Sequence, residues 1–125
     1  MKAIKEIVRI LKVNGQALVT VWAKEQEINE KKSTYIRKPV KSMASSENES
    51  SMATNDELIV HTPRTEFQRS DCLVPWIKPT ATYLRYYHVF VQNELDNLLK
   101  QISNIEILKS YNDDGNWCAV FRKTA

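Results

Sequence analysis

The sequence predicts a single α/β domain that finishes in an antiparallel hairpin. Two segments, residues 4–11 and 95–102, carry apolar residues at the i, i+3, i+4, i+7 spacing of an amphipathic helix. Four apolar or aromatic runs are typical of strands, and they cover residues 17–22, 83–90, 105–108 and 117–121. The last two runs flank Asp-Asp-Gly-Asn, a strong turn signal. At 125 residues, the chain is long enough for one domain at most.

Composition narrows the class of protein. Hydrophobic residues make up 42% of the chain, and no window approaches the roughly 18 apolar residues of a membrane span. The first residues include Glu6 and no long apolar stretch, so we expect neither a signal peptide nor a membrane partner. Cys72 and Cys118 form no ligand pattern with the two histidines. This favours reduced thiols in an intracellular protein and no metal site. The expected compartment is the cytoplasm, with the nucleus as an additional one. The net charge of +3 permits a nucleic-acid partner without requiring one.

The first element is predicted to be a helix with one apolar and one basic side. The apolar stripe is Ile4, Ile7, Val8 and Leu11, and the basic side is Lys2, Lys5, Arg9 and Lys12. We expect the basic side to be solvated, with phosphate contact as the alternative. Asn14 and Gly15 should end the helix, with Gly15 in the left-handed conformation. Residues 17–22 follow as a nearly unbroken apolar run, typical of a strand buried on both faces in a parallel sheet.

Residues 24–57 are predicted to be a disordered insertion. Lys, Glu, Ser and Asn dominate the segment, and its few apolar side chains cannot offset the entropy of ordering it. The functional alternative is a loop that is phosphorylated or that contacts RNA. An apolar patch at residues 58–60 marks the return to order. Residues 71–76 are expected to form an ordered loop anchored by Leu73, Val74 and Trp76.

The C-terminal third is predicted to be regular. We expect a strand over residues 83–90, Asn93 as the cap of the second helix, and Trp117 and Cys118 in the core. No earlier strand is present to pair in parallel with residues 17–22, and without the insertion only about 80 residues remain to form a core. The sequence therefore predicts the second half of a larger α/β domain. Its ordered parts would be residues 1–23 and 58–125.

Four sequence blocks together resemble one enzyme family. The first runs from K-A-I-K-E at residues 2–6 into V-T-V-W-A-K-E-Q at 19–26. The others are D-C-L-V-P-W at 71–76, R-Y-Y-H-V-F at 85–90 with Glu94 and Leu95, and G-N-W-C at 115–118. In this order they resemble the tRNA wobble-uridine carboxymethyl methyltransferases, in particular the methyltransferase domain of the AlkB-homologue type. The resemblance covers nearly the whole chain apart from the low-complexity insertion.

This resemblance implies the C-terminal half of a class I, Rossmann-like fold that uses S-adenosylmethionine. It also implies methylation of the carboxylate of 5-carboxymethyluridine at the tRNA wobble position, with a small zinc-binding activator subunit as partner. The glycine-rich loop and ribose-binding acid of the family have no counterpart here, where Gly15 and Gly115 are the only glycines. We therefore expect no cofactor-binding residue in this chain. The alternative is a non-catalytic remnant that binds tRNA or a partner subunit.

Six side chains are the expected substrate-binding residues, and none is expected to be catalytic in the strict sense. The acceptor carboxylate is already ionised at neutral pH, so the enzyme must supply alignment and a dry pocket rather than a general base. Arg85 is suited to hold this carboxylate or a tRNA phosphate, and His88 to donate to the same anion. Tyr86 or Tyr87 is suited to stack on the uracil. The expected walls of the pocket are Trp22 and Trp76.

Each of these roles has a structural alternative. Tyrosines in a strand more often pack within a sheet, a single histidine is more often structural, and Trp22 and Trp76 suit a core equally well. Alternation along a strand places Arg85 and Tyr87 on one face, and it places Tyr86 and His88 on the other. Arg85 and His88 are therefore expected to share a pocket only if the strand bends.

Overall fold

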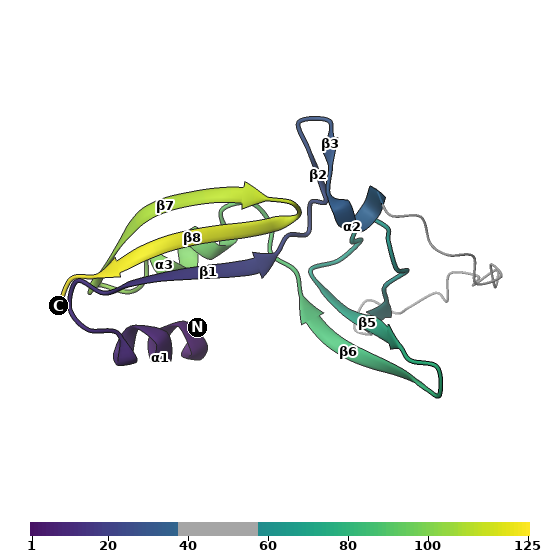
Figure 1. Cartoon of the computed structure of the whole chain (residues 1–125), viewed down its shortest axis with the longest axis horizontal. Helices are drawn as coiled ribbons and strands as arrows, with labels where there is room; N and C mark the ends of the chain where they lie inside the picture. Colours follow the sequence, from purple (N-terminus) through teal and green to yellow (C-terminus); the bar gives the residue numbers. More distant parts are fainter. Residues whose placement is uncertain (38–57) are drawn as a thin grey trace.

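The computed structural model describes residues 1–37 and 58–125. The helices are α1 (Lys2–Ile10), α2 (Thr34–Arg37) and α3 (Glu94–Leu99), and the strands are β1 (Gln16–Trp22), β2 (Glu27–Ile28), β3 (Lys31–Lys32), β4 (Ile59–Val60), β5 (Asp71–Ile77), β6 (Thr82–His88), β7 (Ile105–Asp113) and β8 (Asn116–Lys123). One part contains a sheet of order β1-β8-β7, and the part beside it contains a sheet of order β4-β5-β6 and the short β2–β3 ladder (Figure 1). The predicted α/β class is confirmed, with mostly antiparallel pairing.

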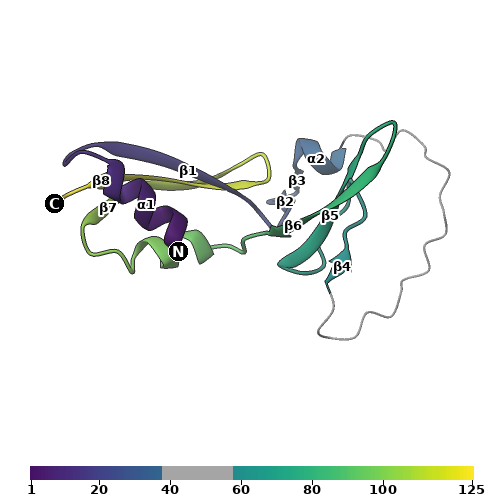
Figure 2. The same cartoon turned by 90° about the horizontal axis from the view of Figure 1, so that it is seen from below.

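Helices α1 and α3 lie on the same side of the β1-β8-β7 sheet (Figure 2). The buried centre of this part combines residues of both helices with residues of β8, namely Ile4, Val8, Leu95, Leu99, Ala119 and Phe121. Alternate residues of β1 and β7 pack around this centre. The apolar stripes therefore face the core, and both predicted helices are confirmed.

The end of α1 differs from the prediction. The helix ends at Ile10, and Leu11 is already extended, with a ψ of 140°. Asn14 is the left-handed residue of the connection, with a φ of 68°, whereas Gly15 is not left-handed. Asn tolerates this region because its short side chain can hydrogen-bond locally. The Gly15 N–H donates to the Lys12 carbonyl at 2.8 Å, so a tight turn follows the helix in place of the predicted glycine cap.

Strand β1 is antiparallel to β8 along its whole length, so its predicted parallel pairing is not what the structure contains. The expectation that it is buried on both faces is also wrong. Exposure alternates along the strand, and Leu18 is 57% exposed while Val19 packs against the core. Alternation of this kind is typical of an antiparallel sheet with one solvated face.

The predicted C-terminal hairpin is confirmed. Strands β7 and β8 pair from Ile105–Lys123 to Asp113–Asn116, with an irregularity between Ile107 and Lys109. The turn places Asp114 at a φ of 46° and Gly115 at a φ of 81°. Two consecutive positive φ values match the right-handed twist of the flanking strands, which is why Asp-Gly is favoured at this position.

Residues 71–76 form a strand, not the predicted loop. Strand β5 pairs with β6 over its full length and with β4 over two residues. The Leu73 carbonyl accepts from the His61 N–H at 2.7 Å, so the backbone groups of Leu73 point toward β4. Pro75, two residues on, points to the same side but lies beyond the end of β4. Its missing N–H therefore costs the β5–β6 ladder nothing.

The prediction of disorder is wrong for residues 24–37. This stretch forms the β2–β3 ladder and α2, and both Gln26 and Ser33 are buried. The Asp114 carboxylate accepts from the Thr34 N–H at 2.6 Å at the start of α2. Order in this polar stretch thus comes from hydrogen bonds to the distant hairpin. The rest of the predicted insertion, residues 38–57, lies outside the described residues.

Backbone hydrogen bonds join the two parts. The Phe90 N–H donates to the Trp22 carbonyl at 2.8 Å, and the Lys24 N–H donates to the Phe90 carbonyl at the same distance. Ala23 and Phe90 form an isolated parallel bridge at this point. The end of β1 and the residues after β6 are therefore held together. Across the part of the chain that the structure describes, no helix is long and apolar enough to cross a membrane.

Candidate nucleic-acid interface

One face of the β5–β6 ribbon alternates cations with aromatic rings. The antiparallel register places Trp76 opposite Tyr83, and the alternate residues Arg85 and Tyr87 share their side of the ribbon. Lys78, at the tip that follows β5, reaches over the same rings. These five residues are called here the cation–aromatic face.

Both cations of this face lie over rings. The Arg85 Cζ is 5.5 Å from the ring centroid of Trp76 and 5.4 Å from that of Tyr87. The Lys78 Nζ is 3.9 Å from the Trp76 centroid and 5.9 Å from the Tyr83 centroid. Each such contact stabilises an exposed cation by about 0.5–1 kcal/mol. Because Trp76 is 46% and Tyr83 is 53% exposed, a ligand can reach this face from solvent.

The inner end of the cation–aromatic face is anchored in an aromatic core. The Trp22 ring meets those of Tyr87, Tyr35 and Phe67 edge-on, with centroid separations of 5.4, 5.0 and 4.8 Å. Edge-to-face contacts of this length are favourable for aromatic pairs. The structure therefore gives Trp22 a packing role, in which it fixes the ring of Tyr87.

A buried histidine completes this core. The His61 ring stacks on Phe67 with 4.0 Å between centroids, and its Nε2 lies 3.0 Å from the Tyr35 hydroxyl. Burial lowers the pKa of His61 because the core disfavours the charged imidazolium. His61 is thus a structural residue of this core, and its surroundings favour the neutral imidazole.

The opposite face of the ribbon carries a hydrogen-bonded network around His88. Its Nδ1 lies 2.9 Å from the Asp71 carboxylate, and its Nε2 bonds to the Glu94 carboxylate. The Tyr86 hydroxyl donates to the same carboxylate of Asp71. Both ring nitrogens of His88 are therefore occupied by acids of the chain itself.

The hydrogen bonds and charges of this network shift the pKa values of its members. Partial burial lowers the pKa of His88, but the hydrogen bonds and charges of Glu94 and Asp71 outweigh that effect and raise it overall. The hydrogen bond from Tyr86, followed by that from His88, lowers the pKa of the Asp71 carboxyl. The same bond to Asp71 raises the pKa of the Tyr86 hydroxyl. The network therefore consists of two carboxylates that share one imidazole, with the Tyr86 hydroxyl bonded to one of them.

The structure divides the six predicted site residues between two faces. Arg85, Tyr87 and Trp76 share the cation–aromatic face, with Trp22 behind Tyr87. The remaining two, Tyr86 and His88, belong to the opposite face, so the predicted separation of Arg85 from His88 is confirmed. With both nitrogens engaged by carboxylates, His88 has no free N–H for the anion that Arg85 would hold.

A second group of residues, missed by the sequence interpretation, fastens the site to the hairpin. The buried Gln26 amide donates to the Ala23 carbonyl at 2.6 Å and to the Gly115 carbonyl at 3.1 Å. Its oxygen accepts from the Ser33 hydroxyl at 2.6 Å. A Cβ on Gly115 would lie 2.3 Å from that same oxygen, so only glycine fits this approach. The sequence did contain a signal for this connection, because Gln26 and Gly115 each belong to a motif block, V-T-V-W-A-K-E-Q and G-N-W-C respectively.

Glu25 makes a second connection between this segment and the hairpin. Its carboxylate accepts from the Trp117 indole N–H at 3.2 Å and from the Gln92 backbone N–H at 3.3 Å. Trp117 is half-buried, whereas Cys118 is buried as predicted. Glu25 and Trp117, both from the motif blocks, thus position the segment between β6 and α3.

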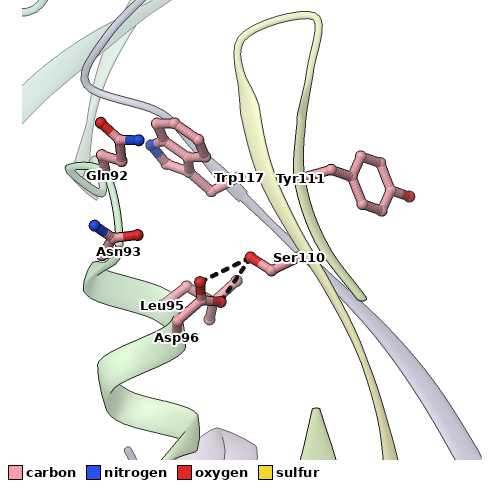
Figure 3. A pocket seen from close by; sticks show the side chains of 7 residues that line it. All are labelled: Gln92, Asn93, Leu95, Asp96, Ser110, Tyr111 and Trp117. Atoms are coloured by element: carbon pink, nitrogen blue, oxygen red, sulfur yellow. Dashed lines mark hydrogen bonds between the residues drawn. The ribbon is translucent and has the colours of Figure 1, made fainter. Parts of the chain in front are cut away.

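A cavity of about 190 Å³ opens between the start of α3 and the β7–β8 hairpin (Figure 3). Its lining residues are Gln92, Asn93, Leu95, Asp96, Ser110, Tyr111 and Trp117. The Ser110 hydroxyl lies 2.8 Å from both carboxylate oxygens of Asp96, and the Tyr111 ring points away from the cavity. None of the predicted site residues lines it. The cation–aromatic face is therefore the stronger candidate.

A metal ion requires a cluster of acidic, His or Cys side chains, and the phosphate or nucleoside part of a cofactor is typically held by a glycine-rich loop. Residues 1–37 and 58–125 contain no group of three or more acidic, His or Cys side chains placed to hold a metal ion. Gly115 sits in a hairpin turn filled by Gln26, and Gly15 sits in the turn after α1, so neither forms a glycine-rich cradle for a nucleoside. These residues do not fit the cofactor of the family.

Sequence comparison gives relatives with named activities. The chain is 35% identical, over 97% of its length, to the tRNA (carboxymethyluridine(34)-5-O)-methyltransferase alkbh8 of Xenopus tropicalis. It is 32% identical, over 98% of its length, to the Mus musculus protein of that name. A shorter match, 42% identical over 38% of the chain, is to an Arabidopsis thaliana protein also named tRNA (carboxymethyluridine(34)-5-O)-methyltransferase. No family model matches the chain.

These matches cover only a segment of each relative. The chain spans 23% of the Xenopus tropicalis protein, 27% of the Mus musculus protein and 12% of the Arabidopsis thaliana protein. It therefore corresponds to about a quarter of the length of the two longer matches.

Proposed function

Because the chain belongs by sequence to the tRNA carboxymethyluridine methyltransferases, of which it spans one segment, we propose that it forms a tRNA-facing part of such an enzyme. The reaction would be methylation of the carboxylate of 5-carboxymethyluridine at the wobble position. The observation that carries this proposal is the cation–aromatic face, in which Arg85 is held between Trp76 and Tyr87.

Arg85 is the residue best placed to meet the substrate. A guanidinium presents its N–H groups in a planar fork that matches a carboxylate or a phosphate. Its two close partners are the Trp76 and Tyr87 rings, which do not occupy its N–H donors as a carboxylate would. No ion pair to Arg85 is present within residues 1–37 and 58–125. The charge of Arg85 is thus available to RNA.

The proposal assigns S-adenosylmethionine to parts of the methyltransferase domain beyond this segment, since the relatives are roughly four times as long. The cofactor would supply the methyl group. This segment would contribute the C-terminal strands of a Rossmann-like methyltransferase fold, and the whole enzyme would act in the cytoplasm with a small zinc-binding activator. The role of the described residues is to bind and orient the tRNA.

The test is methyl ester formation by a chimera in which this chain replaces the matching segment of the Mus musculus relative. We expect the chimera to methylate tRNA that contains 5-carboxymethyluridine. Arg85→Ala should abolish product formation while the variant stays folded by circular dichroism. Lys109→Ala, which removes a cation 4.8 Å from the Tyr111 ring on the other sheet, is the matched control and should stay active.

Two results would contradict the proposal. One is an inactive chimera that is folded and is made from an active parent enzyme. The other is near-normal turnover by Arg85→Ala, which would remove Arg85 from the substrate site. Binding of tRNA without any methyl transfer would support a non-catalytic binding segment.

A further inference from the structure

The two faces of the β5–β6 ribbon have opposite charge. On the cation–aromatic face, Lys78 and Arg85 are the charged residues, and the strand positions between them are aromatic or aliphatic. On the opposite face, the Asp71 carboxylate joins that of Glu94 around His88. The cations therefore lie on one face of the ribbon and the carboxylates lie on the other. A polyanion would approach the ribbon from the Lys78 and Arg85 side.

Rings, not acids, hold these two cations in place. In the described part of the chain, no carboxylate forms an ion pair with Lys78 or Arg85. Instead, both cations contact the Trp76 ring. A carboxylate would neutralise a cation, whereas a ring fixes its position and leaves its N–H donors free for an anion. The face is therefore preorganised for negative ligands.

The tip of the ribbon is also fixed. The Lys78 N–H donates to the Ala81 carbonyl at 2.9 Å and closes the turn. Pro79 follows Lys78, and proline restricts the backbone at the start of the turn. The backbone of Lys78 is therefore ordered up to the point where its side chain turns back over Trp76. This reduces the entropy lost when Lys78 binds a ligand.

The spacing of the cations fits a nucleic-acid strand. The Lys78 Nζ and Arg85 Cζ lie 3.9 and 5.5 Å from the same ring centroid, so the two groups are within roughly 10 Å of each other. A nucleic-acid strand carries one charge per roughly 3.4 Å of its axis. Neighbouring phosphates of one strand can therefore reach both cations.

We propose that Lys78 and Arg85 form a paired phosphate clamp, supported by Trp76, that binds the backbone of a single RNA strand. This inference rests on the proposed function and deepens it, because it adds Lys78 to the substrate contacts and gives Trp76 a supporting role. Trp76 holds both cations with its ring and does not wall a base pocket. The clamp does not select RNA by its base sequence, because phosphate contacts position a strand without distinguishing its bases. Its partner is the unpaired anticodon loop of the substrate tRNA.

The test is the salt dependence of binding between the purified chain and an anticodon stem-loop RNA that contains 5-carboxymethyluridine. Each phosphate contact contributes about 0.7 to the slope of log affinity against log salt for single strands. We expect Lys78→Gln to lower the slope by about that amount, and Lys78→Arg to keep it. Trp76→Leu should weaken binding without changing the slope, because both charges remain. Lys109→Gln is the matched control and should change neither quantity.

The outcomes separate this inference from the function on which it rests. If the unaltered chain binds the RNA and Lys78→Gln leaves the slope unchanged, the clamp is overturned while the proposed function stands. If Trp76→Leu binds as tightly as the unaltered chain, the supporting role of the ring is overturned. If the unaltered chain does not bind the RNA, both proposals fail. Circular dichroism of each variant excludes loss of fold as the cause.

Discussion

The side-chain amide of Gln26 donates to the backbone carbonyl of Gly115, 89 positions away in the sequence, at 3.1 Å. Gly115 also accepts from the Ala23 N–H at 2.9 Å, so one carbonyl fastens the end of β1 and the following segment to the hairpin. Because Trp22 precedes this connection directly, the same bonds set the ring that supports Tyr87. The hairpin turn therefore helps to position the candidate site.

Replacement of Gly115 by alanine should weaken this connection. The φ of 81° strains a residue with a Cβ by roughly 1–2 kcal/mol. The added Cβ would also displace the Gln26 side chain, with the loss of a buried hydrogen bond that contributes about 1 kcal/mol. We expect the free energy of unfolding to fall by about 2–3 kcal/mol in urea denaturation. Asp113→Ala, in the same turn, should change it by no more than about 0.5 kcal/mol; equal losses in both variants would refute the role of Gly115.

Glu25→Ala should loosen the same junction from its other side. The substitution leaves the Trp117 indole N–H and the Gln92 N–H without their acceptor. A part-buried donor without a partner costs about 1–3 kcal/mol, so a loss of stability in this range is expected. Glu25→Gln retains one acceptor oxygen and should lose less. Thermal melts of the two variants provide the measurement, and an unchanged melting temperature in Glu25→Ala would contradict the assignment.

Two tryptophans of the site should respond very differently to substitution. Trp22→Leu removes three edge-on ring contacts in the aromatic core, each contributing about 0.5–1.5 kcal/mol, and should cost about 2–4 kcal/mol. Trp76→Leu acts on a ring that is 46% exposed and removes two cation–ring contacts, so it should cost no more than about 1–2 kcal/mol. Urea midpoints at constant m value compare the two. A larger loss for Trp76 would contradict the division between a core ring and a surface ring.

The elements that sequence alone could predict are those specified by local pattern. The stripes of α1 and α3 and the Asp114–Gly115 turn follow from spacings within a few residues, and all three are confirmed. The pairing of β1 was not predictable in this way. Its partner β8 lies at the other end of the chain, and an apolar run alone does not distinguish one buried face from two.

The sequence-based prediction also failed for the polar stretch over residues 24–37, which was expected to be disordered and is ordered in the structure. Its composition indicates disorder, yet Gln26 and Ser33 are buried because bonds from distant residues satisfy them. A composition count contains no information about such partners. At the site, strand alternation correctly separated Arg85 from His88. Lys78 was missed because its place over Trp76 depends on the β5–β6 register and on the turn that follows β5.

Stability should depend on pH through the His88 network. The raised pKa of His88 adds stability below its unfolded value of about 6.5, and this is lost as pH rises through the folded pKa. The lowered pKa of Asp71 adds stability above its ordinary value of 3.8, and this is lost as pH falls through the folded pKa. The contribution of the pair is therefore largest between roughly pH 4 and 6.5.

The measurement is the difference in unfolding free energy between the unaltered chain and His88→Gln. This difference cancels His61, whose lowered pKa acts with the opposite sign and removes stability as pH falls below its unfolded value. We expect a larger difference near pH 5 than near pH 8. A difference that is independent of pH, or larger near pH 8, would contradict the network.

The central claim is that the cation–aromatic face binds the anticodon loop of a tRNA. The most direct measurement is photo-crosslinking of an anticodon stem-loop RNA, with 4-thiouridine at the wobble position, to the chain, followed by mass spectrometry of the adducts. The account predicts adducts at Tyr83 or Tyr87, and their loss when Arg85 is replaced by alanine. Adducts confined to the β1-β8-β7 sheet or to Tyr86 on the opposite face would contradict it.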